Sequence, residues 1–129
     1  MGTLLRLLLA GPEVERSSSR SWGPCESTED FRLMVPQLLN CSLSFASMLE
    51  EARSAESDAD FISKCCIGLK EARESWTRMR VCQRCRIGPH SAARVLVGEG
   101  NELIAIVTTI IKNKRKSVAA KRALVRIKK

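Results

Sequence analysis

The sequence predicts an all-α protein, an antiparallel bundle of helices joined by short loops. Two observations support this fold class. Good helix formers such as alanine, leucine, glutamate, lysine and arginine are abundant, whereas aromatic residues make up 4% of the 129 residues. Three amphipathic segments, with apolar residues three and four positions apart, follow one another from residue 31 onward. At this length the chain has room for one domain.

Residues 1–30 are predicted to form a poorly structured extension or a degraded first helix. Leu4–Leu9 is long enough for one or two helical turns, but Gly-Pro pairs and a run of serines interrupt the next twenty residues or so. Arg6 divides the apolar run and no convincing cleavage site comes after it, so we do not expect a signal peptide. No apolar stretch approaches the ~20 residues of a membrane span. These features predict a cytoplasmic protein with reduced cysteines and no membrane partner.

The helical bundle is predicted to span residues 31–116. Its first helix opens near Pro36, a residue suited to a first helical turn, and presents one apolar face. That face comprises Leu38, Leu39, Ser42, Phe45, Leu49 and Ala52. The next helix begins after Ser57, an N-cap with Asp60 three positions later, and ends at Gly88-Pro89. Its apolar seam comprises Phe61, Cys65, Gly68, Leu69, Ala72, Trp76 and Met79.

The last helix is predicted to begin between Pro89 and Ser91. Gly98 and Gly100 each cost about 1 kcal/mol relative to alanine in a helix, so a kink or a later start near Asn101 is an alternative. The apolar residues beyond them occupy more than one stripe: Ile104, Val107 and Ile111 turn away from Leu103, Ile106 and Ile110. A small bundle with so wide an apolar surface commonly buries the second face against another subunit. We therefore expect a homo-oligomer, with Ile104, Val107 and Ile111 at its interface.

The positive charge is concentrated at the end of the chain. The formal net charge is +8, yet residues 112–129 hold nine basic side chains and no acidic one, which leaves 13 basic and 14 acidic side chains in the first 111 residues. Cations at several angles around a helix suit the phosphate backbone of RNA or DNA. The alternative is a solubilising end that complements the helix dipole. The candidate nucleic-acid-binding residues are Lys112, Lys114, Arg115, Lys116, Lys121, Arg122, Arg126, Lys128 and Lys129, and residues 117–129 form the basic tail.

No residue constellation predicts an enzyme or a cofactor site. Cys82 and Cys85 form a C-x-x-C pair with His90 close behind, but zinc needs four ligands and the chain offers no second pair. A thioredoxin-like site needs a βαβ context, and no Glu-x-x-His pair exists for a di-iron centre. We therefore expect no catalytic residues, no metal, no cofactor and no small-molecule substrate, with Cys82 and Cys85 as semi-apolar helix residues and His90 in a loop or cap.

The segment from Gln37 to Lys64 resembles a family of four-helix bundle proteins encoded by intervening sequences in large-subunit ribosomal RNA genes. The resemblance rests on Leu49-Glu50-Glu51-Ala52 at the end of one helix and Ser57-Asp58-Ala59-Asp60-Phe61 at the start of the next. Gly68–Glu74 and Asn101–Ile106 look like the family's third and fourth helices. The resemblance covers residues 37–116.

Three departures from the family accompany this resemblance. Met48 stands where the family has asparagine, and Trp76-Thr77-Arg78-Met79 replaces a Tyr-Trp-Leu cluster. Residues 1–36 hold no good copy of the full first helix. The resemblance implies an up-down antiparallel four-helix bundle, with the first helix short or degraded, that assembles as a ring, commonly a pentamer, without catalysis. It also implies an RNA or ribonucleoprotein partner, since basic relatives bind nucleic acid and a reverse transcriptase.

The sequence therefore predicts a non-enzymatic helical-bundle interaction or scaffold protein of the ribosomal RNA intervening-sequence type that self-associates. The alternative is a nucleic-acid-binding accessory protein that contacts RNA or DNA phosphates through its basic C-terminal tail.

Overall fold

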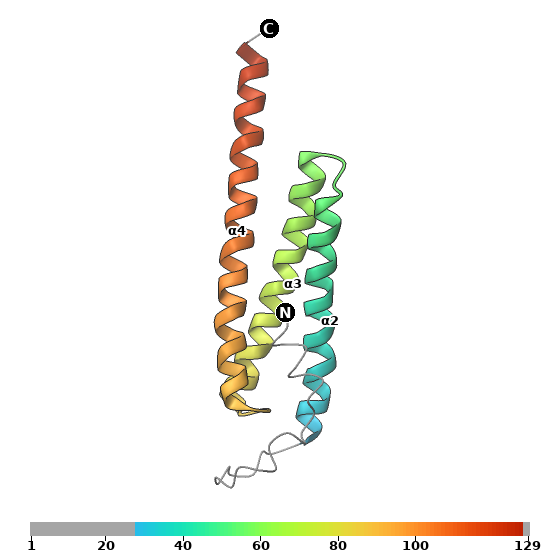
Figure 1. The fold of residues 1–129 in the computed structure, drawn as a ribbon, viewed down its shortest axis with the longest axis vertical. Helices are drawn as coiled ribbons and strands as arrows, with labels where there is room; N and C mark the ends of the chain where they lie inside the picture. The colour runs from blue at the N-terminus through green and yellow to red at the C-terminus, as the bar shows by residue number, and fades with distance from the viewer. Residues whose placement is uncertain (1–27, 128–129) are drawn as a thin grey trace.

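A computed structural model describes the backbone of residues 28–127 and the side chains of residues 32–127. This part of the chain is helical and contains no strand, which confirms the all-α prediction. Its three helices are α2 (Thr28–Arg53), α3 (Asp58–Cys85) and α4 (His90–Ile127). Figure 1 shows α3 between the other two, and the main helix contacts are those of α3 with α2 and with α4. The predictions for residues 1–27, including the helical turns at Leu4–Leu9, lie outside the described residues.

Helix α2 begins earlier than the sequence predicts. Pro36 lies inside the helix rather than in its first turn, because α2 starts at Thr28. Proline has no N–H to donate to the carbonyl of Arg32, one turn before it. The side chain of Pro36 is exposed, so this imperfection lies on the solvent side of the helix.

Helix α3 begins as its sequence predicts and ends slightly before the predicted stop. Ser57 is extended (φ −149°, ψ 162°), and its hydroxyl accepts a hydrogen bond from the backbone N–H of Asp60 at 3.1 Å. The helix ends at Cys85, and Arg86 comes next in the left-handed region at φ 55°. Gly88, the predicted terminator, also has a positive φ and turns the chain into α4.

The core lies along α3, which contributes buried residues to both of its neighbours. Phe45 and Ala52 of α2, Cys65 and Ala72 of α3, and Val107 and Ile111 of α4 form one buried cluster. A side chain at Gly68 would approach the Cβ of Met48 to 3.2 Å, and one at Gly100 would approach the Cδ1 of Trp76 to 3.0 Å. One glycine therefore permits close packing of α3 on α2, and the other permits close packing of α4 on α3.

Helix α4 is continuous from His90 to Ile127, so the alternative start near Asn101 is wrong. The close approach of Gly100 to Trp76 compensates for the low helix propensity of glycine, and the indole Nε1 donates to the carbonyl of Val97 at 3.0 Å. The helix also continues across the predicted boundary between residues 116 and 117. Figure 1 shows that its C-terminal end extends beyond the turn between α2 and α3. No helix in the described part of the chain is both long and apolar enough to cross a membrane.

Candidate functional site

The C-terminal half of α4 holds the predicted nucleic-acid-binding residues on an exposed helix. Lys114 is half-buried, and the other described candidates are exposed: Lys112, Arg115, Lys116, Lys121, Arg122 and Arg126. Lys128 and Lys129 lie outside the described residues. A regular helix fixes the order and direction of these cations, which a flexible tail would not do.

Two of these lysines are held by a carboxylate of α3. The Nζ atom of Lys114 lies 2.7 Å from one oxygen of Asp58, and that of Lys121 lies 3.2 Å from the other. The hydrogen bond from Lys114, which has the larger effect, and the one from Lys121 lower the pKa of the Asp58 carboxyl below its ordinary value of 3.8. Lys114 also lies 5.2 Å from the centre of the Phe61 ring, a cation–π distance. Asp58 therefore fastens the start of α3 to the basic half of α4.

Sequence reasoning does not find this contact, although Asp58 belongs to a recognised helix start. An aspartate in the first turn of a helix is ordinarily explained by the helix dipole. Its pairing with Lys121, 63 residues later, depends on where α4 passes α3. The sequence offers no periodicity or motif that links the two segments.

The apolar faces of α4 are divided differently from the predicted interface. Val107 and Ile111 are 2% and 5% exposed, and Ile104 packs against the same core, because this stripe contacts α3. The neighbouring stripe, about 100° around the helix, remains open: Leu103, Ile106 and Ile110 are 39%, 55% and 41% exposed. Of the two stripes, the residues accessible to a partner are therefore Leu103, Ile106 and Ile110. Whether copies of the chain meet there stays a prediction.

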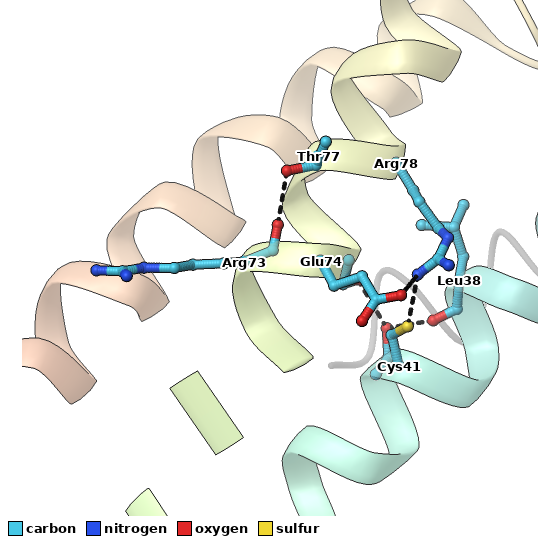
Figure 2. Close-up of polar contacts among 8 residues, drawn as sticks. Leu38, Cys41, Arg73, Glu74, Thr77 and Arg78 are labelled. Carbon is cyan, nitrogen blue, oxygen red and sulfur yellow. Dashed lines mark hydrogen bonds and ion pairs between the residues drawn. The ribbon is translucent and has the colours of Figure 1, made fainter. Parts of the chain in front are cut away.

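A polar cluster joins the middle of α2 to α3 (Figure 2). The Arg78 guanidinium donates to the Cys41 sulfur at 2.8 Å and pairs with Glu74 at 2.6 Å. Beside it, the Ser42 hydroxyl donates to the carbonyl of Leu38 and lies 3.3 Å from the hydroxyl of Ser75. Burial raises the pKa of the Cys41 thiol, and Arg78 opposes that shift.

The same cluster contains three groups that are capable of binding a metal ion. One ligand atom each from Cys41, Glu71 and Glu74 lie within 4.8 Å of one another. The Arg78 guanidinium already bonds to two of these three residues and supplies the positive charge that the carboxylate requires. A metal ion would have to displace this guanidinium, so the arrangement fits an ion-pair network that sets the alignment of α2 and α3.

Cys82, Cys85 and His90 do not converge on one point. Cys82 is buried, and burial raises the pKa of its thiol, whereas Cys85 and His90 are exposed. The three are not among the groups of possible metal ligands within the described residues. His90 is the first residue of α4, close to the loop or cap position predicted for it.

No protein-family model matches the sequence, and no curated protein is significantly similar to it. The fold is similar to the crystal structure of a protein of unknown function from the S23 ribosomal protein family of Bacteroides thetaiotaomicron. The two chains are 22% identical, with a TM-score of 0.60, over 86% of this chain and 96% of that chain. This likeness shows a shared helical fold and carries no function with it.

Proposed function

We propose that this protein is a non-enzymatic helical interaction module that self-associates through one face of α4. The observation that carries the proposal is the exposed stripe of Leu103, Ile106 and Ile110 on a helix whose other apolar stripe is already buried on α3. Adjacent apolar residues exposed in this way are typical of a protein–protein contact.

The spacing along α4 favours a second copy of the same helix as the partner. Leu103, Ile106 and Ile110 are separated by three and then four residues, the spacing of a coiled-coil seam. Continued at the same alternation, the next positions are Asn113, Ser117 and Ala120, so the apolar seam ends at Ile110. Residues 90–111 hold one basic and two acidic side chains, so copies can meet there without joining their cationic ends.

We also propose that the complete fold is an up-down four-helix bundle of the ribosomal RNA intervening-sequence type. The sequence resemblance over residues 37–116 supports this proposal, as does the helical fold shared with the Bacteroides protein. The family resemblance implies a ring, commonly a pentamer. Native mass spectrometry of the full chain gives the number of copies directly.

Sedimentation velocity over a range of concentrations tests self-association. We expect an oligomer that Ile106→Glu converts to monomer, because a charge in an apolar contact is expensive to bury. Leu43→Glu is the matched control, since Leu43 is 55% exposed on α2, as Ile106 is on α4. A wild-type chain that stays monomeric at high concentration would contradict the proposal, and so would equal dissociation by both variants.

A second function, binding the phosphates of RNA or DNA, is favoured by the ordered cations of α4. Within residues 112–127 the helix carries seven basic and no acidic side chains. An oligomer would present several such helices at once and raise the apparent affinity. Binding of the wild-type chain to a 20-nucleotide RNA, measured by fluorescence anisotropy at rising salt, tests this function. A chain that does not bind the RNA at low salt, or whose affinity does not fall as the salt concentration rises, would contradict this function.

A further inference from the structure

A groove lies beside the basic half of α4, where the helix passes the start of α3. It is open, has a volume of about 700 Å³, and is lined by residues from both elements. From the start of α3 come Ser57, Asp58, Ala59 and Ile62. From α4 come Arg115, Val118, Ala119, Arg122, Ala123 and Arg126. Within residues 32–127, every cation that lines this groove is an arginine.

We propose that this groove, the arginine groove, is a binding site for consecutive phosphates of a nucleic-acid strand. The inference rests on the second function proposed above and assigns that function to particular residues. Arg115, Arg122 and Arg126 are the phosphate-binding groups, and Asp58 is an internal carboxylate that competes with the strand for the neighbouring lysines.

The three arginines share one face of α4. Steps of seven and four residues at 100° per residue return the side chain to within about 40° of the same direction. With a rise of 1.5 Å per residue, they extend over about 16 Å of helix. A single phosphate cannot reach all three, whereas each strand of a duplex presents one phosphate per ~3.4 Å of helix axis. The spacing therefore favours a ligand with several phosphates in a row.

The arginines are available for a ligand. Within the part of the chain that the structure describes, Arg122 and Arg126 make no ion pair or hydrogen bond, and Arg115 makes a 3.5 Å contact with the sulfur of Cys66. A guanidinium presents paired N–H groups that match two oxygens of a phosphate. Among the described residues that line the groove none is aromatic, so this lining offers no platform for stacking bases. We therefore expect contacts to the backbone of the strand and little preference for sequence.

Asp58 divides the basic residues into two groups. It pairs with Lys114 and Lys121, whose Nζ atoms lie 2.7 Å and 3.2 Å from its carboxylate oxygens, and within the described structure it forms no ion pair with the three arginines. Its negative charge also lies in the wall of the groove. Neutralising Asp58 should release two lysines toward a bound strand and remove a repulsive group from its path.

The test compares two double variants with the same change in charge. Arg122→Gln/Arg126→Gln removes two cations from the groove, and Lys112→Gln/Lys116→Gln removes two exposed cations of α4 outside it. We expect the arginine variant to bind a single-stranded 20-nucleotide RNA about tenfold or more weakly than the wild type, with a salt slope reduced by about 1.4. The lysine variant should lose much less affinity. Far-ultraviolet circular dichroism confirms that each variant is folded.

The complementary variant is Asp58→Asn, with Glu56→Gln as its control. Both remove one negative charge near the start of α3, but Glu56 does not line the groove. We expect Asp58→Asn to bind RNA several-fold more tightly and with a steeper salt slope, and Glu56→Gln to bind as the wild type does.

The outcomes separate this inference from the function on which it rests. A wild-type chain that does not bind RNA at low salt contradicts both. Binding that both double variants weaken equally contradicts the arginine groove alone and leaves a diffuse basic surface. Unlabelled RNA should displace labelled RNA from the wild-type chain. If polyglutamate of equal charge displaces it equally well, the assignment of the groove to phosphate is overturned.

Discussion

The two halves of α4 belong to one uninterrupted helix but differ in what surrounds them. In the half up to Ile111, one stripe packs on α3, with Val107 and Ile111 in the core. In the half from Lys112 onward, nearly every side chain is exposed, and Asp58 is the acidic group that pairs with it in the described structure. The contrast shows that helix formation and burial are separate: the first half stabilises the fold, whereas the second projects charge from it.

The largest expected effect comes from removing core volume in the packed half. Ile111→Ala should lower the free energy of unfolding by about 2–4 kcal/mol, because the residue is buried and its loss leaves a cavity. Ile127→Ala, at a position that is 81% exposed, should change it by no more than about 0.5 kcal/mol. Denaturation by urea, monitored by circular dichroism, compares them. Similar losses in both variants would show that the two halves are packed alike.

Two glycines in the packed half provide a finer comparison. Gly98→Ala should stabilise the protein by about 0.5–1 kcal/mol, since nothing lies within 4 Å of the added Cβ. Gly100→Ala should destabilise it by about 1–2 kcal/mol, because its Cβ would lie 3.0 Å from Trp76 and 3.1 Å from Met79. Thermal unfolding of both variants checks the opposite signs. Stabilisation by both substitutions would show that Trp76 moves aside without cost.

Shortening the projecting half should have a smaller effect on the fold. A chain that ends at Lys116 keeps the core residues of α4 and loses the exposed end of the helix. We expect its Tm to fall by less than about 4 °C, while its affinity for RNA falls sharply through the loss of Arg122 and Arg126. A truncated chain that does not fold would show that the projecting half contributes to the core.

The smallest expected effect is on the acid stability that Asp58 provides. Because its pKa is lowered in the folded protein, its pairing with Lys114 and Lys121 stabilises the fold fully above its ordinary pKa of 3.8. That stabilisation disappears as the pH falls through the lower folded value. The Tm of the wild type should therefore exceed that of Asp58→Asn at pH 7, and the difference should shrink below about pH 4.

Lys114→Gln/Lys121→Gln serves as the control for this acid effect, because it removes the same contacts from the other side. It should reproduce the loss seen in Asp58→Asn. A difference in Tm that stays constant to pH 2 would mean that the ion pairs contribute nothing to stability.

Much of the fold could be predicted from local sequence features. The N-cap at Ser57 and the positions of the apolar residues in α3 depend on short-range rules, and the structure confirms both. The start of α2 was harder to place, because Pro36 suits a first turn but is tolerated inside a helix on its exposed side. Gly100 is likewise explained only by the nearby Trp76.

The candidate site likewise has some features that follow from local sequence and others that depend on how the helices pack. Composition and spacing are local properties, so the amino-acid sequence is sufficient to place the cations in residues 112–129 and two apolar stripes on α4. The packing of the helices is needed to show that Ile104, Val107 and Ile111 face α3. It is also needed to show that Asp58 pairs with Lys114 and Lys121 while three arginines line a groove. Helical spacing fixes which residues share a face, whereas the packing of α4 on α3 fixes which face is buried.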